Sequence, residues 1–234
     1  MTLYLSRLTL NRSAGNAALA PLLDPESPAQ ALDAHHRLLW SVFADSPDRR
    51  RDFLWRADGE GRFFVLSQRP PAPTDLFAAP EVKAFAPTLA TGDTLAFVLR
   101  ANATKDRALL SRAGPGERQG KSRRVDLVMD LLRDVPKGER AEARMGLADQ
   151  AAADWMGRQG AVHGFAVMQL QVDDYRAIPL LRGSVPRGQR ATLGILDLSG
   201  TLTVTDPALF IARLAMGFGR ARAFGCGLML IRRA

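Results

Sequence analysis

The sequence predicts an α+β protein in which two ferredoxin-like domains follow each other along the chain. The chain has 234 residues, 47% of them hydrophobic, which is enough to bury the core of one large domain or two small ones. The first half has the order strand, helix, strand, strand, short helical piece, strand, which is typical of a ferredoxin-like unit. The second half has helices, a hairpin, a helix and a last strand. We therefore expect an N-terminal domain over residues 1–104 and a C-terminal domain over residues 105–234.

The elements of the first half follow from periodicity and turn residues. Leucines recur between polar side chains at the start of the chain, as in a half-buried strand, and a loop of small residues and proline leads to an apolar pattern of helical period. The Asp58-Gly59 pair predicts a hairpin turn. The expected elements are a strand at 3–10, a helix at 30–44, a hairpin of 52–56 with 62–68, and a strand at 94–101.

The second half is expected to be helical first and to end in strands. Asp206 and Pro207 suit the N-cap and the first position of a helix, and Ser199-Gly200 suits a short turn. The expected elements are helices at 123–132 and 137–159, a strand at 163–171, a hairpin of 190–196 with 198–205, a helix from 207 to 216, and a strand at 227–232.

The charge of the chain is unevenly distributed. The sequence has 32 basic and 24 acidic residues, a formal net charge of +8. Residues 100–124 hold eight basic and two acidic side chains, and residues 176–234 hold nine and two. Such segregation predicts a face that binds a polyanion through long-range attraction and counterion release. A basic surface that serves only solubility remains the alternative.

Two further features concern the compartment. No stretch approaches the roughly 18 uninterrupted apolar residues of a membrane-spanning helix, and residues 1–20 contain two arginines and two asparagines where a signal peptide would be apolar. The single cysteine, Cys226, excludes an internal disulfide and agrees with a reducing compartment. We therefore expect a cytoplasmic protein without a membrane partner.

Few side chains suit catalysis. The three histidines form no HExxH motif and the carboxylates form no cluster, so the sequence predicts no metal site and no cofactor. The GxSxG motif of serine hydrolases and the GxxxxGK[ST] motif of nucleotide-binding loops are also absent, which leaves nucleophilic serine chemistry and nucleotide hydrolysis without support.

A helical projection separates the two adjacent histidines. His35 falls on the apolar face of its helix, where we expect a buried, hydrogen-bonded core residue. His36 falls at the margin of that face beside Trp40, where an imidazole can meet both solvent and substrate, as general acid or base chemistry near neutral pH requires. An ordinary histidine at a helix edge remains the alternative. For His163, at the start of an expected strand, we predict a structural role.

The most specific signal is a glycine and arginine run at residues 217–228. Glycines can let backbone N–H groups approach a phosphate closely while arginines neutralise it, so the run predicts phosphate binding. It is not a dinucleotide fingerprint, because it follows a helix and precedes a strand. A glycine-rich turn required only for tight packing is the alternative. The candidate residues are Gly217, Gly219, Arg220, Arg222, Gly225 and Gly227.

Together these segments resemble the CRISPR-associated endoribonucleases of the CasE family, which mature guide RNA in type I-E systems. The resemblance spans nearly the whole chain and is carried by five motifs. They are YLSRLTL at 4–10, the H-x-x-x-W spacing from His36 to Trp40, RDFLWR at 51–56, FVLRAN at 97–102 and GFGRARAFGCGL at 217–228.

The resemblance implies two ferredoxin-like, RRM-related domains and a defined reaction. Members of the family bind the stem-loop of the CRISPR repeat and cleave at its 3′ base, by attack of a 2′-hydroxyl on the adjacent phosphate without a metal. The products are a 2′,3′-cyclic phosphate, or its opened form, and a 5′-hydroxyl. The enzyme then stays on its RNA as a subunit of the Cascade complex. The implied partners are therefore the repeat stem-loop RNA and the other Cascade subunits.

By its spacing from Trp40, His36 corresponds to the catalytic histidine of the family. Relatives often have a tyrosine three residues before this histidine, where this chain has Asp33. Asp33 could orient the imidazole or cap the helix. We expect cations to balance the charge of the transition state, with Arg37, Lys105 and Arg220 as candidates.

RNA contacts can also be assigned by element. A helix cannot enter the deep major groove of A-form RNA, so we expect a thin basic hairpin with its loop at 182–190 to read the stem. Arg187 and Arg190 would lie at its tip, and the residues expected to follow the RNA backbone are Arg100, Lys121, Arg123 and Arg124. Two other functions remain open: a non-catalytic RNA-binding subunit, and a basic scaffold that binds protein or DNA.

Overall fold

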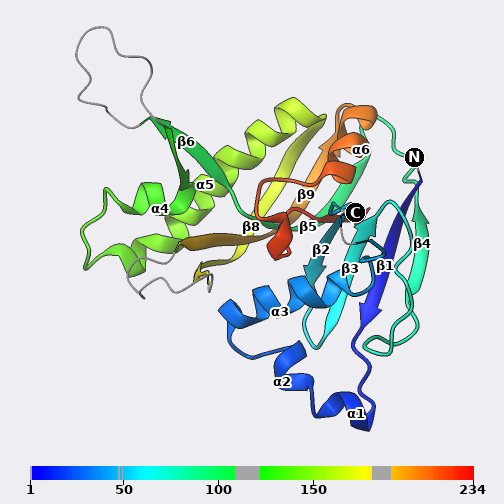
Figure 1. The fold of residues 1–234 in the computed structure, drawn as a ribbon. Coiled ribbons are helices and arrows are strands. Elements are labelled where there is room, and N and C mark those ends of the chain that lie inside the picture. The colour runs from blue at the N-terminus through cyan, green and yellow to red at the C-terminus, as the bar shows by residue number, and fades with distance from the viewer. Residues whose placement is uncertain (1, 47, 49, 109–121, 181–190) are drawn as a thin grey trace, which may run out of the picture.

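The computed structural model describes residues 2–46, 48, 50–108, 122–180 and 191–234 (Figure 1). Two four-stranded antiparallel sheets, each with its own helices, form the body of the protein, and a separate two-stranded hairpin projects from the second half. The α+β class and the tandem ferredoxin-like architecture predicted from the sequence are thus confirmed.

The first sheet has the strand order β2-β3-β1-β4, with every neighbouring pair antiparallel. This is the ferredoxin-like order, in which the first strand lies between the third and the fourth. Residues 68–80, which form no helix, take the place of the second helix of the motif. The elements are β1 (Leu3–Thr9), α1 (Ala14–Ala17), α2 (Ala20–Leu23), α3 (Pro28–Trp40), β2 (Phe53–Ala57), β3 (Arg62–Ser67) and β4 (Glu81–Phe85).

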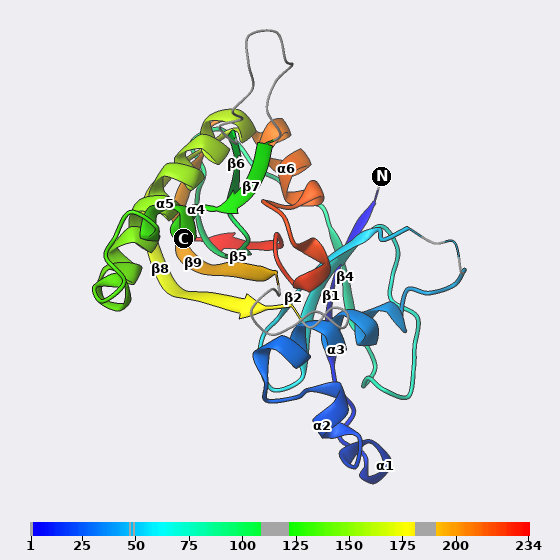
Figure 2. The same ribbon diagram turned by 60° about the vertical axis from the view of Figure 1, so that its left-hand side comes forward.

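The second sheet repeats this order as β10-β5-β9-β8. Its core forms between the sheet and α5, whose buried face includes Ala148, Ala152, Trp155 and Met156. Figure 2 shows α5 running along this sheet. The elements are β5 (Thr94–Ala101), β6 (Thr104–Ala108), β7 (Ser122–Asp126), α4 (Leu127–Leu132), α5 (Arg140–His163), β8 (Phe165–Pro179), β9 (Thr192–Val204), α6 (Pro207–Met216), the 3-10 turn η2 (Arg222–Phe224) and β10 (Met229–Arg233).

The strand at 94–101 exists, but it belongs to the second sheet. β5 pairs with β9 and β10, and the fourth place in the first sheet is filled by β4, which the sequence pattern did not predict. β4 is an exposed edge strand next to a proline-rich segment, so it lacks the apolar alternation that marks β5. The chain therefore passes from one sheet to the other between Phe85 and Thr94. Independent domains divided at residue 104 remain a prediction.

Two other expectations for the second half need correction. Residues 122–126 form β7 and only the following stretch is helical, because Asp126 caps α4 by accepting a hydrogen bond from the backbone of Met129. Ser199-Gly200 is not a turn but lies inside the continuous strand β9. A Cβ atom on Gly200 would stand 2.0 Å from the carbonyl oxygen of Gln169, beside a register shift of β8. The glycine therefore marks an irregular strand pairing.

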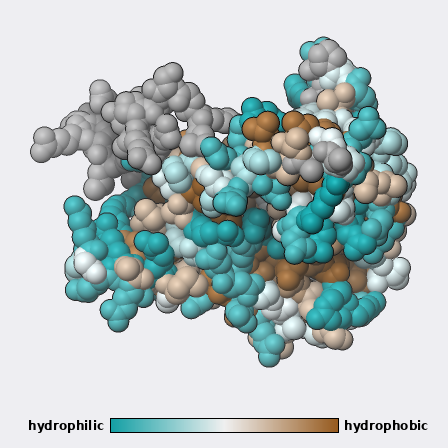
Figure 3. Space-filling view, turned by 90° about the horizontal axis from the view of Figure 1, so that it is seen from below, coloured by the Kyte–Doolittle hydropathy of each residue, from teal (hydrophilic) through white to brown (hydrophobic). Residues whose placement is uncertain are grey.

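The helix α3 joins the two halves. Leu38 and Leu39 pack into the core of the first sheet, while Ala29 and Leu32 contact a smaller cluster around Cys226 and the ends of β8 and β9. The glycine-rich segment after α6 lies between the two sheets in both ribbon views (Figures 1 and 2). The surface seen from below is mostly hydrophilic with a few apolar patches (Figure 3). Among the described helices, none is long and apolar enough to cross a membrane.

Candidate active site

The helix α3 presents its two histidines differently. It begins after Ser27 with Pro28 at its first position, and its inner face buries His35, Leu38 and Leu39. His36 is half-buried at the edge of that face. The positions predicted from helical periodicity are therefore confirmed for both histidines.

His35 is part of the core. Its Nε2 lies 2.8 Å from Oδ1 of Asp24, and its ring meets the edges of Phe63 and Trp55 at centroid distances of 4.8 and 6.2 Å. Burial lowers the pKa of His35, although the hydrogen bond to Asp24 opposes that shift. The imidazole is 8% exposed, so it anchors the helix and does not face solvent.

His36 lies between two aromatic side chains. Its ring centroid is 6.4 Å from that of Trp40, one helical turn further on, and 6.3 Å from that of Phe224 in η2. The neighbours of this imidazole thus come from α3, which packs on the first sheet, and from the glycine-rich loop that precedes β10 of the second sheet. A ring held by packing on two sides and partly open to solvent is suited to proton transfer.

Asp33 has neither of the roles considered for it. Ser27 occupies the N-cap of α3, and Asp33 Oδ2 pairs with Nη2 of Arg37 at 2.8 Å, one turn away. Both side chains are largely exposed. The charge of Arg37, a candidate catalytic cation, is therefore already shared with a neighbouring carboxylate.

The glycine run forms a tight loop that packs against both sheets. Gly217 ends α6, the N–H of Phe218 donates to the carbonyl of Gly227 at 2.9 Å, and the N–H of Gly227 donates to the carbonyl of Arg100 at 2.7 Å. A Cβ atom on Gly219 would stand 2.8 Å from the carbonyl oxygen of Asn102. The geometry supports the packing alternative for Gly217 and Gly227, whose N–H groups bond within the fold. Phosphate binding by the glycines stays a prediction.

Gly225 offers a direct test of that packing role. It adopts φ 75°, and a Cβ atom would stand 2.9 Å from Cζ3 of Trp55, which is 1% exposed. We expect Gly225→Ala to destabilise the protein by about 2 kcal/mol, because the left-handed backbone and the fixed indole both oppose a methyl group. Urea unfolding measures the change.

Gly157 provides the matched control for this substitution. It lies in α5 with no atom within 4 Å of its ideal Cβ position, so Gly157→Ala should stabilise the helix by about 0.5–1 kcal/mol. Equal effects of the two substitutions would contradict the packing role of Gly225.

Arg100, an expected RNA contact, is engaged inside the protein. Its Nε and Nη2 donate to the two carboxylate oxygens of Asp197 at 2.7 and 3.0 Å, and Arg176 Nη2 donates to the same carboxylate at 2.7 Å. Burial alone would raise the pKa of Asp197, but the hydrogen bonds from the two arginines outweigh it and lower the pKa. Arg100 therefore neutralises a half-buried carboxylate between β5 and β9.

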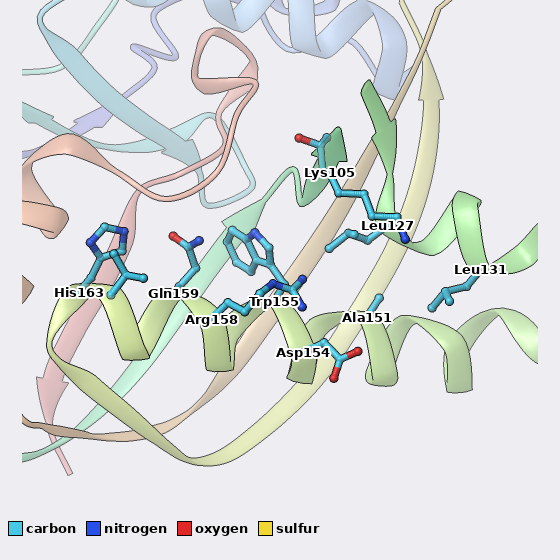
Figure 4. A pocket seen from close by; sticks show the side chains of 11 residues that line it. Lys105, Leu127, Leu131, Ala151, Asp154, Trp155, Arg158, Gln159 and His163 are labelled. Carbon is cyan, nitrogen blue, oxygen red and sulfur yellow. The ribbon is translucent and has the colours of Figure 1, made fainter. Parts of the chain in front are cut away.

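Lys105, a candidate catalytic cation, is paired with an aspartate and lines a cavity. Its Nζ pairs with Oδ2 of Asp130 at 2.7 Å, and the side chain lines a cavity of about 420 Å³ between β6 and α5. Figure 4 shows Trp155, Gln159 and His163 projecting from one side of α5 toward the space beside Lys105. The aromatic rings recorded next to His36 are not part of this lining. The structure thus places Lys105 and His36 in separate surroundings.

The remaining basic candidates differ in position. Arg123 and Arg124 are exposed on β7, where Arg123 stands opposite Arg107 of β6 and Arg124 Nε pairs with Oδ1 of Asp106 at 3.2 Å. Arg220 is exposed in the loop, and Arg222 is half-buried with Nη2 3.3 Å from the carbonyl of Gly217. The predicted contacts Lys121, Arg187 and Arg190 lie outside the described residues.

Sequence reasoning missed the aromatic partner that the loop supplies to His36. Phe224 stands among small residues and arginines, and only the fold shows that η2 packs against α3. An aromatic inside a glycine-rich run was the available signal, because such a residue needs a packing partner. Within the described residues, no three His, Cys, Asp or Glu side chains are placed to hold a metal ion.

Comparison with known proteins adds to this geometry. A family model described as CRISPR associated protein matches residues 3–233. Cas6e from Escherichia coli str. K-12 has the same fold, with a TM-score of 0.64 and 21% identity over 99% of this chain and 100% of that one. Thermus thermophilus Cse3 bound to an RNA representing a pre-cleavage complex matches with a TM-score of 0.63 and 22% identity, over 99% of this chain and 100% of that one. A chain of a CRISPR RNA-guided surveillance complex matches with a TM-score of 0.59 and 16% identity, over 99% of this chain and 100% of that one. No curated protein sequence matches the chain.

Proposed function

This chain belongs to the family of CRISPR-associated proteins, and on that premise we propose that it is an endoribonuclease that binds the stem-loop of CRISPR repeat RNA and cleaves it at its 3′ base. The observation that carries the proposal is the half-buried ring of His36, held between Trp40 and Phe224 where the two sheet units meet. The similar fold of Cse3, solved with RNA, supports an RNA substrate.

The reaction needs proton transfer and charge stabilisation only. His36 takes the proton of the 2′-hydroxyl as general base while the 2′-oxygen attacks the adjacent phosphorus. The bond from phosphorus to the 5′-oxygen breaks, and the leaving oxygen takes up a proton. The products are a 2′,3′-cyclic phosphate and a 5′-hydroxyl, and neither step requires a metal ion. Cationic side chains near the phosphate stabilise the charge that develops on it.

Exposed arginines provide the RNA-binding part of the proposal. Arg123 and Arg124 on β7 and Arg220 in the glycine loop are exposed and suited to phosphates of the stem. Lys121, Arg187 and Arg190 remain sequence-based candidates for the same role. Arg100 contributes to the fold through Asp197. Contact of Arg100 with RNA stays a prediction.

After cleavage, the protein stays bound to the stem-loop as a subunit of Cascade. The similarity to a chain of a CRISPR RNA-guided surveillance complex over 99% of the sequence supports this assignment. The product stem-loop is unchanged by cleavage at its base, so the phosphate contacts that bound the substrate persist in the product.

Cleavage in the presence of a chelator tests the proposed chemistry. Labelled repeat RNA incubated with the protein in excess EDTA should be cut at the 3′ base of the stem and should end in a cyclic phosphate, because no metal takes part. A matched RNA with 2′-deoxy at the nucleotide before the scissile bond should bind equally but stay intact. Cleavage of the deoxy RNA would overturn the 2′-hydroxyl mechanism. Binding without cleavage of either RNA would indicate a non-catalytic stem-loop binder.

A further inference from the structure

Four arginines gather around the glycine loop without a carboxylate. Arg213 lies in the last turn of α6, Arg220 and Arg222 lie in the loop, and Arg51 stands two residues before β2. Within the described part of the chain, none of these four arginines has a carboxylate within ion-pair distance, whereas half-buried Arg69, Arg100 and Arg107 each pair with an aspartate. The group therefore concentrates positive charge that the fold leaves uncompensated.

These guanidinium groups are partly withdrawn from water and repel one another. Arg51, Arg213 and Arg222 are half-buried. Burial, followed by repulsion from Arg222, lowers the pKa of both Arg51 and Arg213, and burial with repulsion from Arg220 lowers the pKa of Arg222. Holding like charges together in this way destabilises the free protein, and an anion bound among them would offset the cost.

Two of the guanidinium groups are held in place by neutral partners. Arg213 donates from Nη2 to Oε1 of Gln159 at 3.1 Å, and its Cζ lies 5.2 Å from the ring centroid of Phe218. Its Nε is buried with no hydrogen-bond partner. Arg222 donates from Nη2 to the carbonyl of Gly217 at 3.3 Å. Each guanidinium has five N–H donors, so this anchoring leaves donors on both side chains for an oxyanion.

The cluster borders the surroundings of His36. Arg222 begins the turn η2 that ends with Phe224, whose ring lies 6.3 Å from that of His36. Arg51 precedes Phe53, which packs at 5.4 Å on Trp40, the other aromatic neighbour of His36. Each aromatic neighbour of the imidazole is thus connected to an arginine: Phe224 lies in the same turn as Arg222, and Trp40 packs on Phe53, two residues after Arg51. Arg37 and Lys105, by contrast, are paired with Asp33 and Asp130.

We propose that Arg51, Arg213 and Arg222 together hold one phosphate group of the RNA backbone beside His36. The inference rests on the proposed RNA-processing function and adds to it two residues, Arg51 and Arg213, that the sequence did not single out. Guanidinium groups without a carboxylate partner suit the oxygens of a phosphodiester. The positions of Arg222 and Arg51, close along the chain to Phe224 and Phe53, suit a phosphate at or adjoining the scissile bond.

The test asks whether the arginines contact one particular phosphate of the RNA. Affinity for a synthetic repeat hairpin is measured for the wild type, Arg51→Gln, Arg213→Gln and the double variant, with a series of RNAs that each carry one neutral methylphosphonate. At one position near the scissile bond, the methylphosphonate should weaken binding of the wild type but leave that of the double variant unchanged. The slope of log Kd against log salt should also fall by about 0.9 in the double variant, as for one lost phosphate contact.

Arg62→Gln is the matched control. This exposed arginine in β3 pairs with Asp58 and Glu60, so its loss should keep both the salt slope and the pattern of methylphosphonate effects of the wild type. Equal methylphosphonate effects in the wild type and the double variant at every position would overturn the inference.

Thermal unfolding without RNA separates ligand binding from a structural role. Arg51 makes no side-chain hydrogen bond to a described residue, so Arg51→Gln removes only repulsion and should unfold at the same temperature as the wild type or higher. A lower unfolding temperature with an unchanged salt slope would show that Arg51 is structural and would contradict the proposal. A wild type that fails to bind repeat RNA would instead overturn the proposed function on which the inference rests.

Discussion

Replacing His36 with alanine should lower the rate of repeat RNA cleavage by about 10²–10⁴-fold, the usual contribution of a positioned general acid or base. The affinity for the RNA should change little, because the imidazole is one side chain among many that contact the RNA. Single-turnover cleavage with enzyme in excess measures the chemical step, and equilibrium binding to the 2′-deoxy RNA measures affinity. Added imidazole should restore part of the rate by filling the space between Trp40 and Phe224.

His163→Ala is the matched control for this loss. His163 ends α5, and its ring lies 6.5 Å from that of Phe218, whereas the aromatic neighbours of His36 are Trp40 and Phe224. Its removal should leave the cleavage rate within a small factor of that of the wild type. If His36→Ala cleaves at the rate of the wild type, or if both variants lose activity equally, His36 is not the proton-transfer residue.

Asp197→Asn should produce the largest loss of stability, about 3 kcal/mol in the free energy of unfolding. Asp197 is 14% exposed and accepts hydrogen bonds from Arg100, which is 21% exposed, and from Arg176. An amide keeps the shape of the side chain but removes its charge, which leaves the half-buried guanidinium of Arg100 without compensation. Urea unfolding should show a lower midpoint with an unchanged dependence on denaturant.

The exposed pair of Asp33 and Arg37 provides the comparison. Their side chains are 49% and 73% exposed, so Asp33→Asn should change the free energy of unfolding by less than about 0.5 kcal/mol. A similar effect of the two aspartate substitutions would mean that the contact between Arg100 and Asp197 is no stronger than a surface ion pair.

The features that the sequence predicted well depend on local patterns. The two histidines of α3 differ by one position in a helix of 3.6 residues per turn, so periodicity alone assigns one to the core and the other to the margin. The hairpin of β2 and β3 follows from alternation about Asp58-Gly59 in the same way. In both cases the information lies within a few neighbouring residues.

The features that it missed depend on contacts between distant segments. The alternating pattern of β5 predicts a strand. The sheet to which this strand belongs depends on its pairing with β9 and β10, which lie about a hundred residues or more later in the chain. Arg100 looks like any other basic residue until the fold places Asp197 beside it. The sequence predicted part of the arginine group. Arg220 and Arg222 lie in the glycine motif, whereas Arg51 is near them only in the folded protein.

The position of Phe224 in the chain bears on the order in which the protein becomes active. His36 lies early in the sequence and its aromatic neighbour Phe224 lies late, in a segment held by Gly227 on β5 and followed by β10 in the same sheet. Such a contact closes a very long loop and is expected to form late in folding. During synthesis the ribosome must therefore release nearly the whole chain before the imidazole has both of its neighbours. A partly made chain would carry the histidine and much of the basic surface, but not the completed site.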